Sequence, residues 1–228
     1  MIDPLSGLRL LFTFVGGSGH FDPLVPIARA AEAIGHSVAF GCGPSAASLV
    51  HDAGFTSFAM GLDASPVPKR IPLRAVDRER EDRDLRERFA RRAARRRVPL
   101  VISLCSEWRP DVLVCDEMDF GAVIAAERME LPFATVLVSA AGSFVRSEVL
   151  GEALNEVRAQ HDLPPDPQLE MLDRYLVLSP CPPSYRDPGY PLPRTGHAFR
   201  PSLPKSVPGS LPESRSGSAG VRAPDWCR

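Results

Sequence analysis

The chain has 228 residues, with 27 lysines and arginines against 28 aspartates and glutamates, so its formal net charge at pH 7 is −1. A balance this close to zero argues against nucleic acid or an anionic membrane surface as the main partner, because both attract a surplus of positive charge. Hydrophobic residues make up 44% of the chain and charged residues 24%, which is typical of a globular protein and not of a disordered one.

The start of the chain lacks the pattern of a secretory leader. No basic segment precedes the apolar residues 8–15, and this run is too short to span a bilayer. The five cysteines are an odd number without C-x-x-C spacing, so they predict neither a disulfide framework nor a metal site. We expect a reduced, cytoplasmic protein without stable membrane insertion.

The first predicted unit is a buried strand, a glycine turn and a helix. The apolar run 8–15 ends at Gly16-Gly17-Ser18-Gly19, which indicates a strand that feeds a turn. Asp22 and Pro23 are typical of a helix start, and apolar residues at helical spacing continue to Gly35, a helix terminator. Further along, the sequence predicts a strand at 37–40, a short helix near 44–53 and a strand at 55–58.

A highly charged stretch follows, with ten arginines between residues 78 and 97. Four acid–arginine pairs stand four residues apart with the acid first, the favourable order on a helix. They are Glu79/Arg83, Asp82/Arg86, Asp84/Arg88 and Glu87/Arg91. We therefore expect a solvated, ion-paired helix and not a site for a polyanion.

The second half repeats the alternation of strand and helix. The elements expected there are strands at 111–115, 133–138 and 175–178, and helices at 120–128, 148–160 and 168–174. Short buried strands that alternate with helices predict an α/β fold with a doubly wound, mostly parallel sheet. Proline, glycine and serine make up half of residues 201–228, so we expect a domain over 1–200 and a disordered tail after it.

Two strand ends carry polar residues suited to chemistry. Ligands of an open parallel sheet bind beyond the carboxyl ends of its strands, and two of these ends carry His20 and Asp116. A histidine here can take a proton at neutral pH if a carboxylate orients its ring. On the residues alone, a second interpretation stays open, in which His20 bonds the backbone of the turn and Asp116 caps the next helix.

A nicotinamide-binding site is disfavoured. The G-x-G-x-x-G pattern that starts at Gly17 is met at Gly19 but fails at Asp22. The second predicted strand also runs into Gly41, Cys42 and Gly43 without the acidic residue that would bind a ribose.

The segment 12–30, FTFVGGSGHFDPLVPIARA, resembles the opening of the GT-B nucleotide-sugar glycosyltransferases, in their bacterial UDP-glycosyltransferase and macrolide branch. Residues 35–40, 53–55 and 109–116 continue the resemblance in the same order. It covers roughly residues 8–200. Because several blocks recur in order, the resemblance is more specific than a single short motif.

This resemblance implies an enzyme of secondary metabolism that transfers a sugar, with inversion, from a nucleotide-sugar to a hydroxyl of a small lipophilic acceptor such as a polyketide or macrolide. His20 matches the family's general base and Asp116 its acidic partner. A UDP- or TDP-sugar would be the co-substrate, with no separate cofactor and no metal. We expect the acceptor near Gly19, Phe21, Met118 and Phe144, with the loops 61–75 and 139–147 as pocket walls.

Members of this family carry a second, C-terminal domain that binds the nucleotide-sugar, and the resemblance here stops near residue 200. We therefore expect a truncated or frame-shifted product, an N-terminal acceptor-binding domain that is inactive unless a C-terminal domain completes it. The alternative is a non-catalytic acceptor-binding or helper protein derived from a glycosyltransferase.

Overall fold

The structure, a computed structural model, describes residues 7–61 and 75–201. The predicted tail after residue 201 and most of the predicted loop 61–75 lie outside these residues.

Seven strands form one sheet in the order β3-β2-β1-β4-β5-β6-β7, and every neighbouring pair is parallel. The order reverses between β1 and β4, which pair directly at the centre. The predicted α/β fold with a parallel sheet is confirmed. The strands are β1 (Arg9–Thr13), β2 (Ser37–Cys42), β3 (Thr56–Ala59), β4 (Val112–Asp116), β5 (Phe133–Val136), β6 (Leu176–Ser179) and β7 (Gly196–Ala198).

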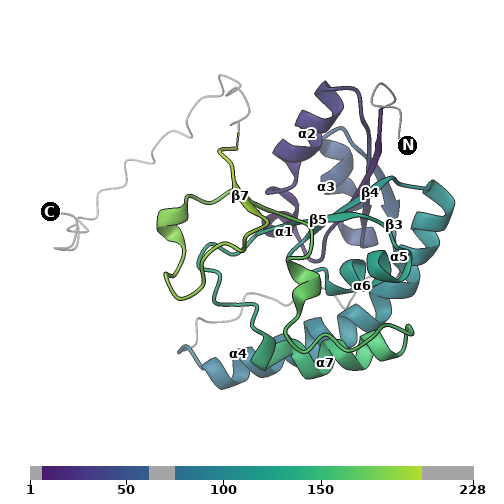
Figure 1. Cartoon of the computed structure of the whole chain (residues 1–228). Helices are drawn as coiled ribbons and strands as arrows, with labels where there is room; N and C mark the ends of the chain where they lie inside the picture. The colour runs from purple at the N-terminus through teal and green to yellow at the C-terminus, as the bar shows by residue number, and fades with distance from the viewer. Residues whose placement is uncertain (1–6, 62–74, 202–228) are drawn as a thin grey trace, which may run out of the picture.

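Helices cover both faces of the sheet (Figure 1). The helices α2 and α3 lie on one face, whereas α5 and α6 lie on the other with α4 and α7 farther out. The helices are α1 (Ser18–Phe21), α2 (Val25–Ala33), α3 (Ala47–Asp52), α4 (Arg78–Asp84), α5 (Ala94–Trp108), α6 (Phe120–Arg128) and α7 (Ser147–Ala159). A π-helical segment, η2 (Leu85–Ala93), joins α4 to α5, and the 3₁₀ turns are η1 (Pro44–Ala46), η3 (Glu170–Leu172) and η4 (Pro183–Tyr185).

The alternation of side chains along the central strand divides the core into two clusters. Phe12 belongs to an aromatic cluster on the α2 side, where its ring stacks on that of Phe40 at a centroid distance of 5.1 Å. Leu11 points to the opposite face and packs with residues of α5 and α6, such as Val101 and Ile124. Because both faces are filled, the sheet is a rigid support for the residues at its carboxyl edge.

The first helix begins earlier than predicted. Gly16 adopts a φ of +90°, and the chain turns into α1 directly at Ser18. Asp22 therefore follows α1 at its C-terminus, and its side chain is not the cap of α2, which begins at Val25. The glycine turn, and not the Asp22–Pro23 pair, sets the start of the helical segment.

The charged stretch is helical as predicted, but its ion pairs differ. Among the four predicted pairs, the described residues form the one between Glu87 and Arg91. The π-helical winding of η2 changes the spacing of side chains, and α7 and the chain leading into it supply other partners. Arg91 also bonds Glu156 of α7 at 2.7 Å, and Asp82 pairs with Arg146 at 2.6 Å. These ion pairs link the charged stretch to α7, so the helix is ion-paired as predicted but takes partners from α7 and the chain before it in addition to the predicted spacing.

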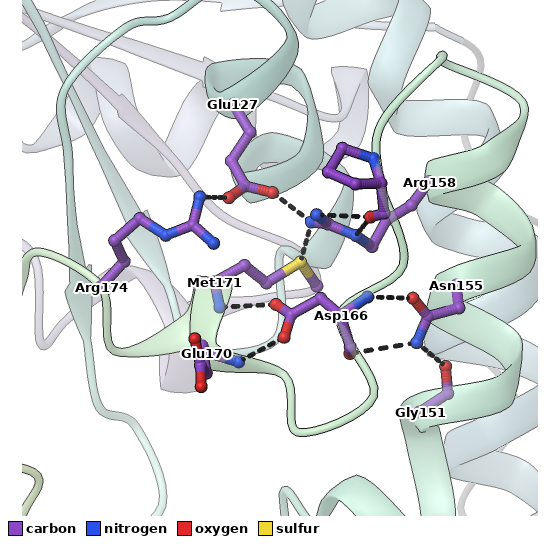
Figure 2. Close-up of polar contacts among 9 residues, drawn as sticks. Glu127, Gly151, Asn155, Arg158, Asp166, Glu170, Met171 and Arg174 are labelled. Atoms are coloured by element: carbon purple, nitrogen blue, oxygen red, sulfur yellow. Dashed lines mark hydrogen bonds and ion pairs between the residues drawn. The ribbon is translucent and has the colours of Figure 1, made fainter.

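A buried ionic network links α6, α7 and the segment that follows α7 (Figure 2). The Glu127 carboxylate pairs with the guanidinium groups of both Arg158 and Arg174. In the same region, the Asp166 carboxylate accepts hydrogen bonds from the backbone N–H groups of Glu170 and Met171 at 2.9 and 2.8 Å. These contacts fix the turn η3 and the residues around it, which form part of the pocket described below.

The four cysteines in the part of the chain that the structure describes are unpaired thiols. Within the same residues, no helix is both long enough and apolar enough to cross a bilayer.

Candidate active site

His20 and Asp116 meet at the point where the strand order reverses. His20 lies in α1, directly after β1, and Asp116 is the last residue of β4. Because β1 and β4 are parallel neighbours, their carboxyl ends bring the two side chains together. Nδ1 of His20 lies 3.3 Å from Oδ1 of Asp116. This contact lacks the alignment of a full hydrogen bond, which is common before a substrate is bound.

Asp116 is held rigidly. Its side chain is fully buried, Oδ2 accepts a hydrogen bond from the Val15 N–H at 2.7 Å, and Oδ1 accepts one from the Met118 N–H at 2.6 Å. Burial raises the pKa of the Asp116 carboxyl, while the contacts with His20 and Val15 oppose that rise. The carboxylate is thus fixed in position by backbone donors from two strand ends.

The imidazole of His20 is oriented by this carboxylate. The contact with Asp116 raises the pKa of His20 above 6.5, although burial of the ring acts in the opposite direction. On its other side the ring lies against Gly16, where an added Cβ would come within 2.9 Å of Cδ2. With Nδ1 turned toward Asp116, Nε2 is the nitrogen left for a hydroxyl group. The pair can therefore accept a proton from an alcohol and stabilise the resulting imidazolium.

A second buried ion pair supports this edge of the sheet. Arg97 pairs with Asp119, and its guanidinium also donates to the Phe14 carbonyl oxygen at 3.3 Å. Asp119 caps α6, since its side chain accepts from the Ala122 N–H. One of the ten arginines between residues 78 and 97 is therefore neutralised by a buried carboxylate. Sequence reasoning missed Arg97, because nothing in the run of arginines marks one of them as buried.

A pocket of about 360 Å³ opens beside the same edge. Its apolar walls include Leu137, Leu172 and Val177, and its charged lining consists of Glu117, Asp173 and Arg186. Neither His20 nor Asp116 lines it. Glu117 connects the two sites, because it directly follows Asp116, lines the pocket, and contributes through its charge to the raised pKa of His20.

Glu117 is a buried acid. The side chain is nearly inaccessible, and Oε1 accepts a hydrogen bond from the Ser139 N–H at 2.9 Å. Burial raises the pKa of Glu117 to about 7, although the bond from Ser139 opposes the rise. Its side chain therefore changes charge near neutral pH. The sequence carried no signal for this residue beyond its place one position after a strand end.

Because the pKa of Glu117 is higher in the folded protein than its ordinary value of 4.5, the folded state holds a proton that the unfolded chain has released between pH 4.5 and 7. Stability should therefore fall as the pH rises through this window. We expect Glu117→Gln to remove this loss, and to gain roughly 3 kcal/mol relative to the wild type between pH 4 and pH 8, at about 1.4 kcal/mol for each pKa unit. Urea unfolding at both pH values measures it. Glu152→Gln, at an exposed carboxylate of α7, is the control and should show no such gain.

The residues described here contain no cluster of three or more histidine, cysteine, aspartate or glutamate side chains arranged to hold a metal ion.

Comparison with curated proteins finds glycosyltransferases of antibiotic biosynthesis. The chain is 25% identical over 126 residues to L-demethylnoviosyl transferase of Streptomyces niveus, and 30% identical over 139 residues to 4'-demethylrebeccamycin synthase of Lentzea aerocolonigenes. These matches cover 55% and 58% of this chain, but 33% of each relative. No family model matches the chain.

Solved structures of glycosyltransferases share the fold. The forosaminyltransferase SpnP has a TM-score of 0.63 at 23% identity, and the match covers 91% of this chain and 54% of SpnP. The kitacinnamycin glycotransferase has a TM-score of 0.67 at 17% identity, with 93% of this chain and 56% of that structure covered. The resemblance to GT-B glycosyltransferases is confirmed. The chain spans about a third of the length of the curated relatives and about half of these structures.

Within this glycosyltransferase fold, the predicted site residues fall into two groups. His20 and Asp116 are brought together, Gly19 lies exposed beside them, and Phe144 lines the pocket. Phe21 and Met118 are buried instead: the Phe21 ring packs on Phe14 at 5.4 Å, and Met118 belongs to the core under α5 and α6. Neither lines the pocket, so their positions do not favour the predicted role in acceptor binding. Both apolar side chains pack in the core.

One of the two loops predicted to form pocket walls lines the pocket. The loop 139–147 supplies Gly142, Phe144, Val145 and Ser147 to the pocket. The other predicted wall, the loop 61–75, lies mostly outside the described residues. Sequence reasoning missed Thr135 and Arg186, two polar residues of the lining that no motif distinguishes.

Proposed function

We propose that this chain is the acceptor-binding half of an inverting glycosyltransferase, with His20 as the general base. The observation that carries the proposal is the contact between His20 and the buried carboxylate of Asp116 at the central edge of the sheet. The likeness to antibiotic glycosyltransferases supports the type of reaction.

The geometry supplies the first part of such a reaction. Nε2 of His20 takes the proton of an acceptor hydroxyl, and Asp116 stabilises the imidazolium that forms. The acceptor oxygen then attacks the anomeric carbon of a nucleotide-sugar from the face opposite the leaving group. The bond to the nucleoside diphosphate breaks, and the configuration at that carbon inverts. The pocket beside Glu117 would hold the lipophilic body of the acceptor.

We further propose a small lipophilic alcohol as acceptor and a UDP- or TDP-sugar as donor. Among the similar solved structures, the rhamnosyltransferase SpnG was crystallised with thymidine diphosphate and also with the spinosyn aglycone. These ligands belong to that protein. They support the choice of substrate classes for this chain, whose pocket has mostly apolar walls.

The 228 residues by themselves should transfer no sugar at ordinary enzymatic rates. The diphosphate that leaves carries negative charge that must be stabilised by fixed donors. Arg97, a buried cation whose charge interacts with Asp116, is already paired with Asp119. A completed protein, in which a C-terminal domain of a related transferase supplies the donor site, should be active.

The test incubates the purified chain with hydroxylated aglycones and labelled UDP- and TDP-sugars, alone and fused to the C-terminal half of a related transferase. We expect glycosylated product from the fusion and none above background from the chain alone. Turnover of about one per second or faster by the chain alone would contradict its inactivity. Absence of product from every correctly folded fusion would contradict the proposed reaction and favour the helper role, in which aglycone binding persists without transfer.

A further inference from the structure

A buried guanidinium nitrogen without a partner lines the pocket. Among the described residues, Nη1 of Arg186 is buried and makes no hydrogen bond, and Oγ1 of Thr135 is buried in the same lining with the Cys115 thiol as a neighbour. Both residues belong to the pocket lining, although they come from segments 51 residues apart in the chain. A buried donor that stays unpaired costs free energy, so Nη1 of Arg186 points to a ligand that accepts its hydrogen bond, and the Thr135 hydroxyl can add a second bond to that ligand.

The guanidinium of Arg186 is held in place for such a bond. Its Nε donates to the Tyr190 carbonyl oxygen at 3.1 Å, which fixes one edge of the planar group. Another part lies against the backbone of Gly142, where an added Cβ would come within 2.3 Å of Nη2. Gly142 also has a φ of +82°, so glycine suits both the backbone and the space. The cation is thus positioned without an acidic partner among the described residues, and Nη1 remains unbonded.

Thr135 presents its hydroxyl from the sheet itself. Thr135 of β5 pairs with Cys115 of β4. Leu137 and Glu117 follow two residues later in these two chains. Because side chains alternate between the faces of a sheet, Thr135, Glu117 and Leu137 lie on one face. Only 3% of Thr135 is exposed, and its hydroxyl can donate or accept. The cavity therefore combines apolar walls with a guanidinium donor, a buried hydroxyl and the Glu117 carboxyl.

We propose that Arg186 and Thr135 select an acceptor whose apolar ring body carries a carbonyl oxygen, with Nη1 of Arg186 donating to that oxygen. The inference rests on the proposed function, because it assigns this pocket to the acceptor. A neutral carbonyl suits the lining better than a carboxylate, since Glu117 and Asp173 also face the cavity and would repel an anion. An arginine donor that loses its acceptor is left buried and unpaired, so a ligand without the carbonyl is discriminated against.

The test uses two probes with the same three-ring skeleton and hydroxyl group, 1-hydroxyanthraquinone and 1-hydroxyanthracene, which differ in the two carbonyl oxygens. Binding to the full 228-residue chain is followed by quenching of protein fluorescence. We expect the quinone to bind the wild type about 10- to 100-fold more tightly than the anthracene, and Arg186→Met to abolish that preference. Thr135→Val, which keeps the shape of the side chain, should reduce it several-fold. Arg194→Met, at an exposed arginine outside the lining, should leave it unchanged.

Equal affinity of the two probes for the wild type, or no binding of either, would overturn the inference. So would an unchanged preference in Arg186→Met and in Thr135→Val. The proposed function fails by a different result, because His20→Ala should bind both probes as the wild type does and, in the fusion with a C-terminal half, lose only sugar transfer. A failure of carbonyl selection therefore leaves the role of His20 intact.

Discussion

Replacing Glu127 with glutamine should destabilise the protein by about 3–5 kcal/mol, because it leaves a buried arginine without its counter-charge. The side chains of Glu127 and Arg158 are 5% and 2% exposed, and their ion pair joins α6 to α7 (Figure 2). Water cannot solvate the Arg158 guanidinium once the carboxylate is gone. The free energy of unfolding from urea titration measures the effect.

Arg174 offers a matched control. It pairs with the same carboxylate, but its side chain is 43% exposed, so Arg174→Met should cost less than about 1 kcal/mol. The double variant Glu127→Leu/Arg158→Leu removes both buried charges and should recover most of the stability lost in Glu127→Gln. Equal losses in Glu127→Gln and Arg174→Met would show that burial does not set the strength of this network.

In a protein completed by a donor-binding domain, His20→Ala should lower the rate of sugar transfer by about 10²- to 10⁴-fold, the usual contribution of a positioned general base. Acceptor affinity should change little, because His20 does not line the pocket. Since the pKa of His20 is raised, the wild-type rate should also fall as the pH drops through that pKa, where the ring becomes protonated.

Initial rates at saturating acceptor, together with the acceptor dissociation constant, separate these two effects. His51→Ala is the control, because His51 is exposed on α3 at the surface and should be replaceable without loss. A rate for His20→Ala within about threefold of the wild type would remove His20 from the proposed chemistry.

The sequence predicted those features that depend on local pattern. The run at 8–15 with its glycine turn, and the strand that ends at Asp116, place both members of the pair at one edge once the sheet is parallel. The short strand β7 was missed, since Gly196–Ala198 has no apolar pattern and pairs only because β6 offers a free edge.

Burial could not be predicted in the same way. Arg97 and Arg158 look like other surface arginines in the sequence, yet each is buried against an acid from another element. Phe21, next to His20 in the sequence, was expected to lie near the acceptor. Successive residues of a helix point in different directions, however, and the Phe21 side chain packs in the core. The lining of the pocket also depends on contacts between distant segments, so the sequence around Arg186 did not indicate that this residue lines the pocket.

The pKa of His20, measured by NMR in the wild type and in Asp116→Asn, tests whether the buried carboxylate acts on the imidazole. Spectra of His20→Gln assign the resonance among the five histidines. We predict a pKa above 6.5 in the wild type and a lower pKa in Asp116→Asn, where the ring loses its hydrogen-bonding carboxylate while burial and the charges of Glu117 and Asp119 still act on it. The same pKa in both proteins would contradict it, because the carboxylate would then neither orient the imidazole nor stabilise its protonated form.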